Sequence, residues 1–512
     1  MRFLTPKKLN DPFLSINAVG GKVLVWPGEF SHWLNMKTIL DKLVEMGHTV
    51  TVITHTATPS VMTKRSAGFN FEILQVPHTT EDSENVLNEM LKYWMYDMEK
   101  DSFIQVFLKM SRAIDKMMAQ NYALCRAMFA KKDLLEKLKM EQYDVVLEDP
   151  MSLCGDLVAD VLGLPLVLTI RFSFGNTIER HVGKLPSPLS FRLKNHLFCF
   201  FHDVLYHVMV WQTWDHLYTE LRGKPTKASE ILGKADIWLI RTNWDFEYPR
   251  PFLPNFKFVG GLHCKPSKPL PDEMEKFVQS SGDDGIVVFT LGSMIKNLTT
   301  ERANTIASAL GQIPQKVLWR YSGVKPDTLG PNTKLFDWIP QNDLLGHPKT
   351  KAFITHGGTN GLYEAIYHGV PVVGLPLFAE QPDNLDHIRT KGAAVMLDFN
   401  KMDSNDLLSS MRVVINDPLY KENMMRLSKI HHDQPLTPLE QAVFWIEFVM
   451  RNKGAKHLRV QAHNLTWYQY HCLDVAACIF AIVGLIVFIF LKVCRFCLHK
   501  CCGSKQQKRK SE

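Results

Sequence analysis

The sequence predicts an α/β protein with two doubly wound domains, followed by one membrane-spanning helix. In two stretches, from residue 22 and again from residue 285, short apolar runs alternate with helical patterns, as in parallel sheets covered by helices. A third observation is the run 475–491, which contains no charged residue and lies near the C-terminus. With 512 residues and 46% apolar composition, the chain can bury more than one core.

The first stretch opens with a strand, a helix and a second strand. Residues 33–46 carry an apolar stripe with helical spacing, and Gly47 ends the helix. The expected strands of this half are 22–26, 49–54, 143–150 and 166–170. Strands that follow crossover helices run parallel to their neighbours, so we expect a parallel sheet.

The second stretch repeats the pattern. Its expected strands are 286–290, 316–320, 352–355 and 371–375, with a helix at about 301–310. Two such domains enclose a cleft, and ligands bind beyond the carboxyl ends of the strands. We divide the chain into an N-terminal segment 1–20, a first Rossmann-like domain 21–240, a second 241–435, a connecting segment 436–470, a transmembrane helix 471–491 and a basic tail 492–512.

The most informative segment begins at residue 353 and predicts a buried strand, a glycine turn and the start of a helix. Unpaired N–H groups at a helix start stabilise an anion, and Gly357 and Gly358 let the backbone approach a phosphate closely. His356 stands at the strand end, where a ring N–H can reach a phosphate oxygen. A Gly-Gly turn by itself is common in α/β folds and would carry little weight.

The helix that follows adds two polar side chains. Asn360 and Glu364 are four residues apart and share one helix face. A carboxylate one turn into the helix suits the two hydroxyl groups of a ribose, although not a phosphate. The whole segment therefore predicts a pocket for a nucleotide diphosphate.

Longer patterns point to a family. The sequence THGG from Thr355, with the Asn and Glu that follow it and PVVGLPLFAEQ from Pro371, resembles the signature of the UDP-dependent glycosyltransferases. The stretches DWIPQNDLLGHP from Asp337, FWIEFVMR from Phe444 and GAKHLR from Gly454 resemble the membrane-bound vertebrate UDP-glucuronosyltransferases, family 2 above all. The resemblance extends from about residue 21 to the C-terminus.

The resemblance implies the GT-B architecture, with the acceptor bound by the first domain and the UDP-sugar by the second. It also implies that a helix at about 439–451 crosses back to pack on the first domain. The implied reaction transfers glucuronic acid from UDP-glucuronate to phenols, steroids, other alcohols or carboxylic acids, with inversion, and releases UDP. The alternatives are the same chemistry with another UDP-hexose and a catalytically silent partner of related transferases.

For catalysis, the resemblance implies His32 as the base and Asp149 as the group that orients it. His32 follows the first strand, and an imidazole there can accept a proton from an attacking alcohol or phenol. Asp149 ends a hydrophobic strand, and the adjacent Glu148 is expected on the opposite strand face. The alternatives are a solvated loop histidine and an aspartate that caps the next helix.

For the donor, the resemblance implies contacts from both sides of the glycine turn. The implied residues are Arg241, Thr290, Ser293, Trp338, Gln341, His356, Gly357, Gly358, Asn360, Glu364, Glu380 and Gln381. Trp338 would stack on uracil, although tryptophan is more often part of a core. Glu380 stands where relatives commonly carry Asp, and the longer acid could shift sugar preference or rate. No metal or other cofactor is expected, because the helix dipole replaces the cation.

The formal net charge of +7 is concentrated at the C-terminus, where residues 492–512 hold +6. The body is close to neutral, so no nucleic-acid partner is expected. Aromatic residues precede the run 475–491 and basic residues follow it, which favours a membrane span over a buried core helix and places the tail in the cytosol. Lys508 and Lys510 have the spacing of a dilysine retrieval signal, so we expect a single-pass protein of the endoplasmic reticulum. Family resemblance implies homo- or heterodimers.

The N-terminal segment 1–20 contains Pro6, Lys7 and Asp11 and has no continuous apolar run of a signal peptide. A lumenal body needs an entry signal. Either an internal segment, 161–170 or 197–210, directs insertion, or this N-terminus comes from an alternative start.

Six of the ten cysteines lie in or beside the span, so the body is not expected to rely on disulfides. For Cys494 and Cys497, acylation or no role is favoured over a metal site. Asn297 and Asn464 begin glycosylation sequons. Asn297 is the better candidate, since Asn464 lies close to the membrane.

Overall fold

The computed structural model describes residues 20–61, 68–170, 204–249, 252–295, 297–470 and 472–508. The chain divides into two units, Met1–Leu458 and Arg459–Glu512. The predictions for residues 1–19, for the part of the insertion segment 197–210 up to residue 203 and for Lys510 lie outside the described residues.

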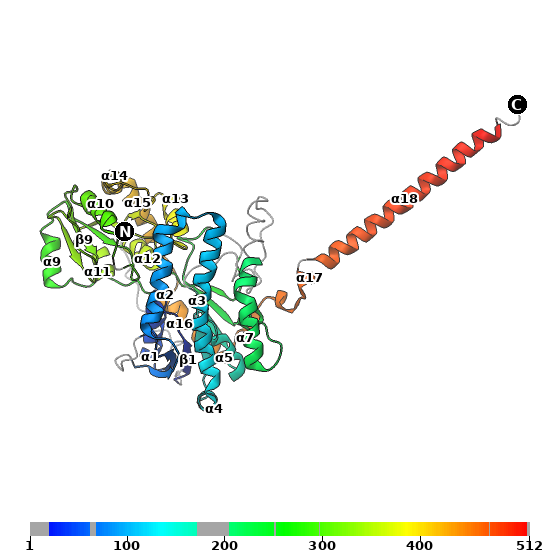
Figure 1. The fold of residues 1–512 in the computed structure, drawn as a ribbon, viewed down its shortest axis with the longest axis horizontal. Helices are drawn as coiled ribbons and strands as arrows, with labels where there is room; N and C mark the ends of the chain where they lie inside the picture. Colours follow the sequence, from blue (N-terminus) through cyan, green and yellow to red (C-terminus); the bar gives the residue numbers. More distant parts are fainter. Residues whose placement is uncertain are drawn as a thin grey trace, which may run out of the picture. The chain divides into compact units, whose positions relative to one another are not determined.

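Among the described residues, seven parallel strands form the first sheet, in the order β3-β2-β1-β4-β5-β6-β7. Figure 1 shows the fold, with β1 labelled. The bounds of the strands are β1 Lys22–Trp26, β2 Thr49–His55, β3 Asn70–Leu74, β4 Val145–Glu148, β5 Leu166–Ile170, β6 Ile237–Ile240 and β7 Phe256–Phe258. The four strands expected in this half are confirmed as β1, β2, β4 and β5. Because β7 pairs with β6, the first sheet continues beyond residue 240, where the sequence placed the end of the domain.

The second sheet, as far as the structure describes the chain, has six parallel strands in the order β10-β9-β8-β11-β12-β13. Their bounds are β8 Ile286–Thr290, β9 Lys316–Arg320, β10 Thr333–Phe336, β11 Thr350–Thr355, β12 Val372–Gly374 and β13 Ala394–Met396. Side chains alternate along β8, so Val287 and Phe289 pack in one core while Ile286 and Val288 pack in another. Helices therefore cover both faces, and the doubly wound pattern expected from the sequence is confirmed.

The helices around the two sheets supply apolar side chains to these cores. In the described part of the first half they are α1 Ser31–Glu45, α2 Thr80–Lys92, α3 Phe103–Ala130, α4 Lys132–Met140, α5 Gly155–Leu162, α7 Gln212–Arg222 and α8 Ala228–Leu232. In the second half they are α9 Asp272–Gln279, α10 Thr300–Leu310, α11 Gln341–Leu345, α12 Thr359–His368, α13 Gln381–Thr390, α14 Ser404–Asn416, α15 Pro418–His432 and α16 Pro438–Asn452.

Helix α16 returns to the first domain, as the resemblance implied. Thr437 and Glu440 form a capping box at its start, and Pro438 is its first residue. Its buried face packs with β1, β4 and α1 in the core of the first sheet. Beyond the helix, Nζ of Lys453 lies 2.6 Å from Oδ1 of Asp144, which adds a polar tie to the first domain.

A segment of the first half packs in the opposite direction, on the second domain. We call residues 80–97, which comprise α2 and the π-helix Tyr93–Asp97, the α2 arm. Its Leu91 and Met95 are buried in a core of the second sheet. The ring of Trp94 stacks on Phe378, with centroids 5.4 Å apart and planes 8° from parallel. The α2 arm of the first half therefore packs on the second domain, and α16 of the second half packs on the first domain.

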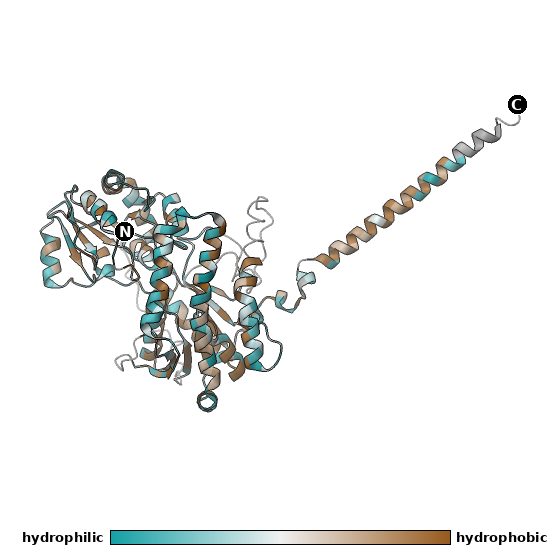
Figure 2. Cartoon of the chain, viewed as in Figure 1, coloured by the Kyte–Doolittle hydropathy of each residue, from teal (hydrophilic) through white to brown (hydrophobic). Residues whose placement is uncertain are grey.

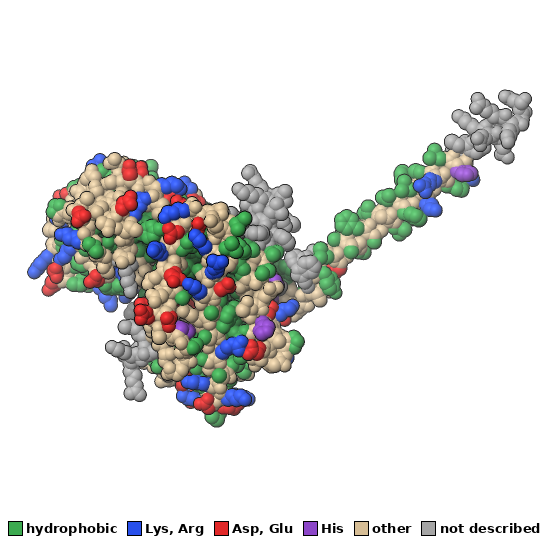
Figure 3. All heavy atoms as spheres, viewed as in Figure 1, with side chains coloured by type: hydrophobic (Ala, Val, Ile, Leu, Met, Phe, Trp, Pro, Cys, Tyr) green, Lys and Arg blue, Asp and Glu red, His purple; other side chains and the backbone are tan. Residues whose placement is uncertain are grey.

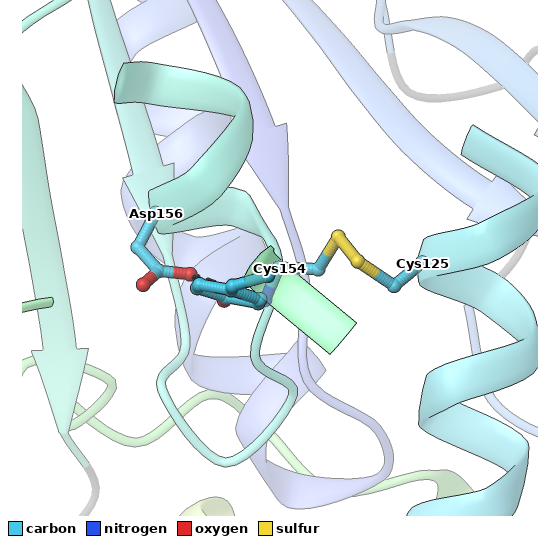
Figure 4. The surroundings of a disulfide bond; sticks show 4 residues. Cys125, Cys154 and Asp156 are labelled. Atoms are coloured by element: carbon cyan, nitrogen blue, oxygen red, sulfur yellow. Dashed lines mark hydrogen bonds between the residues drawn. A yellow bond between two sulfur atoms is a disulfide. The ribbon is translucent and has the colours of Figure 1, made fainter. Parts of the chain in front are cut away.

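The expectation that the body does not rely on disulfides is wrong. Cys125 of α3 and Cys154, which precedes α5, form a disulfide (Figure 4). The two cysteines are 29 residues apart in the sequence. They meet because α3 packs beside the loop that follows β4, a contact that cysteine counts do not reveal. The bond ties α3 to the loop that begins with Asp149.

Glu148 is fully buried at the end of β4, near Asp156. Burial raises its pKa well above the ordinary value, and the charge of Asp156 adds to the shift. At pH values near the ordinary 4.5 and above, the unfolded chain releases a proton that the folded chain keeps. The free energy of unfolding therefore falls as pH rises, by about 1.4 kcal/mol per pH unit, until the folded pKa is reached.

We expect Glu148→Gln to remove this decline. The free energy of unfolding of the variant, relative to that of wild type, should therefore increase from pH 5 to pH 8. Thermal unfolding midpoints across that range measure the difference. Glu141→Gln, a change of an exposed carboxylate paired with Lys22, is the control and should show no such increase. A constant difference between Glu148→Gln and wild type at all pH values would contradict the prediction.

The second unit holds α17 Trp467–Tyr470 and α18 Leu473–Lys508. One stretch of α18, Leu473–Lys500, is long and apolar enough to cross a membrane. Figures 2 and 3 show apolar residues along most of this helix. The helix continues past the expected end at residue 491, because Lys and Arg are good helix formers and a charge does not end a helix. The unit fits a single-pass membrane anchor.

Candidate functional site

The first domain places a histidine and a carboxylate together at the carboxyl edge of its sheet. β1 and β4 are neighbours, with Trp26 opposite Glu148, so the chain leaves both strands at the same edge. His32 is the second residue of α1, and its Nδ1 lies 2.6 Å from Oδ2 of Asp149. Asp149 is fully buried, whereas the side chain of His32 is 15% exposed. The two residues expected to act in catalysis are therefore in direct contact.

Arg241 completes this group. It follows β6, and its Nη2 lies 3.3 Å from Nδ1 of His32 and 3.5 Å from Oδ2 of Asp149. The sequence assigned Arg241 to the donor, and the structure places it beside the histidine and carboxylate. A carboxylate only accepts hydrogen bonds, so the shorter contact places the proton of the neutral imidazole on Nδ1, which donates it to Asp149, while Nη2 of Arg241 donates to the same carboxylate oxygen. The lone pair is then on Nε2.

The charge of Asp149 is fixed by its neighbours. Burial by itself would raise the pKa of Asp149, but His32 and Arg241 outweigh burial and hold that pKa below its ordinary value. The N–H of Met151 also donates to Oδ1 of Asp149, at 3.0 Å. The carboxylate is therefore ionised at neutral pH and can stabilise an imidazolium.

Gly28 makes room for the pair. A Cβ on this residue would stand 2.9 Å from Cβ of His32 and 3.0 Å from Oδ2 of Asp149. We expect Gly28→Ala to displace the two side chains and lower kcat about tenfold or more, because small misplacements of catalytic groups are costly. The Kd for UDP should stay near wild type.

Steady-state rates and titration calorimetry with UDP measure these two quantities. Gly311→Ala serves as the control, since a Cβ there meets nothing closer than 3.4 Å. Wild-type kcat in the Gly28→Ala enzyme would contradict the need for this close approach.

The second domain places a glycine turn at the carboxyl edge of its own sheet. β11 ends at Thr355, and α12 begins at Thr359 with Gly358 as its N-cap. Gly357 has a φ of +88°, and a Cβ there would stand 2.7 Å from Cγ of Leu385. Because Gly358 has no side chain to cap α12, the first N–H groups of the helix can bind an anion.

The loop after β8 packs against this turn. A Cβ on Gly292 would stand 2.6 Å from Nε2 of His356, so the loop and the imidazole are in close contact. Thr290 is 2% exposed, and its hydroxyl accepts the N–H of Gly292 at 3.1 Å. Thr290 therefore supports the loop that presents Ser293.

Glu364 of α12 forms a polar group with residues of neighbouring segments. Gln341 donates from Nε2 to Oε2 of Glu364 at 2.5 Å. Burial raises the pKa of Glu364 to about 7, although Gln341 opposes the shift. Nε2 of His263 lies 3.1 Å from the backbone oxygen of Asn360, and burial lowers the pKa of His263 to about 4. A neutral imidazole therefore stands beside the carboxyl group that the sequence assigned to the ribose.

Trp338 lies on the surface, with 66% of the residue exposed. The guanidinium of Arg320 lies 5.0 Å from its ring centroid. The alternative of a core tryptophan is therefore wrong, and the exposed ring has the surface that stacking on a base requires.

Gln381 is 2% exposed, and its Oε1 accepts the N–H groups of Leu377 at 2.9 Å and Phe378 at 3.2 Å. Its oxygen is therefore used inside the loop, and the NH₂ group is the arm of the amide that these two bonds do not use. Glu380 precedes it and is half-buried. Asn384 donates to the backbone oxygen of Gly357 at 3.0 Å, so α13 is fixed to the glycine turn.

A hydrogen bond across the two domains joins α1, which carries His32, to α12, which follows the glycine turn. Nδ2 of Asn35, in α1, donates to Oδ1 of Asn360, in α12, at 2.8 Å. The predicted base and the predicted diphosphate turn are thereby brought together.

Gly28, Asn35 and His263 were not predicted from the sequence. The available signal for Asn35 was its place one helical turn after His32. For His263 no signal was available, because the strand β7 that positions it was not expected.

The sequence matches the family model described as UDP-glucoronosyl and UDP-glucosyl transferase over residues 21–509. It is 55% identical over 492 residues to UDP-glucuronosyltransferase 2A3 of Cavia porcellus, with 93% of each chain covered. It is 52% identical over 506 residues to UDP-glucuronosyltransferase 2B17 of Homo sapiens, with 96% of each chain covered.

Two solved structures are similar in fold. The glycotransferase of kitacinnamycin has a TM-score of 0.59 at 16% identity, with 84% of this chain and 98% of that chain covered. The calicheamicin glycosyltransferase CalG4 has a TM-score of 0.57 at 17% identity, with 85% and 99% covered. This likeness confirms the expected GT-B fold.

Proposed function

The chain belongs to the UDP-glucoronosyl and UDP-glucosyl transferase family, and from this premise we propose that it transfers glucuronic acid from UDP-glucuronate to small lipophilic acceptors. Phenols, steroids, other alcohols and carboxylic acids are the proposed acceptor classes. The observation that carries the proposal is the contact between His32 and Asp149, which is linked through α1 to the glycine turn where we place the diphosphate.

In the proposed reaction, Nε2 of His32 takes the proton of the acceptor O–H as its oxygen attacks C1 of the sugar. The bond between C1 and the phosphate oxygen breaks, and UDP leaves with the electron pair. Attack opposite the leaving group inverts C1, which gives a β-glucuronide. Asp149 stabilises the imidazolium, in the manner of the carboxylate of a hydrolase triad.

The second domain would hold the leaving group. We place the diphosphate at the first N–H groups of α12, beside His356 and Ser293, and the uracil on Trp338. Glu364 and Gln341 would contact the ribose and the base. The dipole of α12 supplies the positive charge, so we propose that no metal ion is required.

We propose Glu380 and Gln381 as the contacts to the sugar. Glu380 favours a second candidate reaction, transfer from another UDP-hexose, because its carboxylate reaches about one methylene further than the Asp of relatives.

The proposed location is the endoplasmic reticulum membrane, with the body in the lumen and the basic tail in the cytosol. Support comes from the apolar helix Leu473–Lys500 and the basic residues that follow the run 475–491. Association with a second copy or a related transferase is proposed from family resemblance.

Glycosylation tests this topology. Asn297 is exposed, and a lumenal body would make it an acceptor for N-glycans. We expect Asn297→Gln to abolish the gel shift that glycosidase treatment produces, and Asn464→Gln, the control, to retain it. A shift that persists in Asn297→Gln would argue against this site.

The experiment for the reaction uses microsomes that contain the full chain, with UDP-glucuronate or UDP-glucose and either a phenol or a steroid alcohol. We expect glucuronides, and a changed ratio of donor use in Glu380→Asp. Glucosides alone would favour the second reaction. Binding of UDP without any product would instead indicate a silent partner.

A further inference from the structure

We propose that Asn35 is a positioning residue for sugar transfer: it holds the side-chain amide of Asn360 so that the NH₂ group of that amide faces the bound diphosphate. The inference rests on the proposed use of the glycine turn as the diphosphate site. It adds to that site a residue of the first domain.

The orientation of the Asn35 amide follows from its partners. Asn35 is 1% exposed, and its Nδ2 donates to the backbone oxygen of Ser31 at 2.9 Å and to Oδ1 of Asn360 at 2.8 Å. A backbone carbonyl can only accept a hydrogen bond, so the side-chain atom that faces Ser31 must be the nitrogen. The same nitrogen also faces Asn360.

The orientation of the Asn360 amide then follows in turn. Because a nitrogen donates to it, the atom of Asn360 that faces α1 must be the oxygen. The NH₂ group therefore points away from α1. Asn360 is the second residue of α12, beside the N–H groups that would bind the diphosphate. A diphosphate only accepts hydrogen bonds, so NH₂ is the arm of the amide that suits it.

This arrangement also links the base to the donor. His32 and Asn35 lie on the same turn of α1, while Asn360 opens the helix that would hold the phosphates. One short hydrogen bond thus joins the helix that carries the base to the helix that would hold the leaving group. A buried amide is costly unless it is hydrogen-bonded, so both N–H groups of Asn35 favour this single arrangement.

Two variants separate orientation from packing. Asn35→Asp keeps the shape but cannot donate, so Asn360 must turn its NH₂ group to α1 and its oxygen to the diphosphate. Asn35→Ala removes the partner and lets Asn360 rotate. We expect the Kd for UDP to rise about tenfold or more in Asn35→Asp and less in Asn35→Ala. If Asn35 only filled space, Ala would be the worse change, because it leaves a cavity.

The measurement is titration calorimetry of UDP with the full chain in detergent, together with kcat and both KM values. We expect a higher KM for the donor and an unchanged KM for the acceptor. Thr38→Ala is the control on the same helix, since the hydroxyl of Thr38 donates to Leu34 within α1. Its Kd for UDP should equal that of wild type.

A double-mutant cycle tests the route of the effect. On an Asn360→Ala background, Asn35→Asp should change the Kd for UDP little, because the amide that it turns is absent. An undiminished effect there would show that the carboxylate acts by charge alone, and the proposal would be wrong. If wild type fails to bind UDP, the proposed function fails. If wild type and Asn35→Asp bind UDP equally, only the role of Asn35 fails.

Discussion

Replacing His32 with alanine is expected to lower kcat about a thousandfold, the scale of a general base, and to leave the Kd for UDP near that of wild type. The imidazole belongs to the first domain and contacts Asp149, whereas the proposed diphosphate turn belongs to the second. Initial rates at saturating donor and acceptor, with calorimetry of UDP binding, measure both quantities. Turnover retained in His32→Ala would overturn the assignment of the base.

His55→Ala is the matched control. His55 ends β2 on the same sheet, and its side chain is also 15% exposed, but its Nε2 lies 3.7 Å from Glu29 instead of Asp149. Its kcat should stay within the same order of magnitude as wild type.

Asp149→Asn should be nearly as damaging as His32→Ala, because an amide can donate to Nδ1 and so move the ring proton to Nε2.

Replacing both Cys125 and Cys154 with serine is expected to lower the free energy of unfolding by about 3 kcal/mol, the usual scale for a loop of this length. The bond joins residues 29 positions apart and so restricts the unfolded chain. Cys154 also stands five residues after Asp149, so the histidine and carboxylate should lose their arrangement at a lower temperature.

Thermal unfolding and thermal inactivation of the double variant measure both effects, and a reductant should reproduce them in wild type. Cys264→Ser is the control, because Cys264 is a free thiol, and its response to the reductant should match that of wild type. Equal unfolding temperatures for wild type and the double variant would show that the bond contributes no stability.

The sequence predicted best those elements whose residues are buried on both faces. The strands at 166–170, 286–290 and 316–320 were found with their true bounds, because continuous apolar runs between helical patterns have few other interpretations. The short strands β3, β6, β7, β10 and β13 were missed. In β3 and β10, exposed polar residues such as Asn70 and the partly exposed Lys334 interrupt the apolar pattern, and neighbouring strands decide their structure.

The sequence predicted which residues belong to the site, but it did not predict most of the contacts between them, which depend on the fold. His32 and Asp149 were paired in advance only through resemblance, since 117 residues separate them. The position of Arg241 beside this pair depends on the order of β1, β4, β5 and β6 in the sheet, which no local pattern encodes. The same holds for the contact between Asn35 and Asn360.

The α2 arm has a consequence for how such proteins can be recombined. Trp94 is encoded in the first half of the chain, yet its ring lies on Phe378, two residues before Glu380. A chimera that joins residues 1–240 of this chain to the second half of a relative would set Trp94 against a foreign loop. A functional chimera must therefore take residues 80–97 and the second domain from the same parent protein.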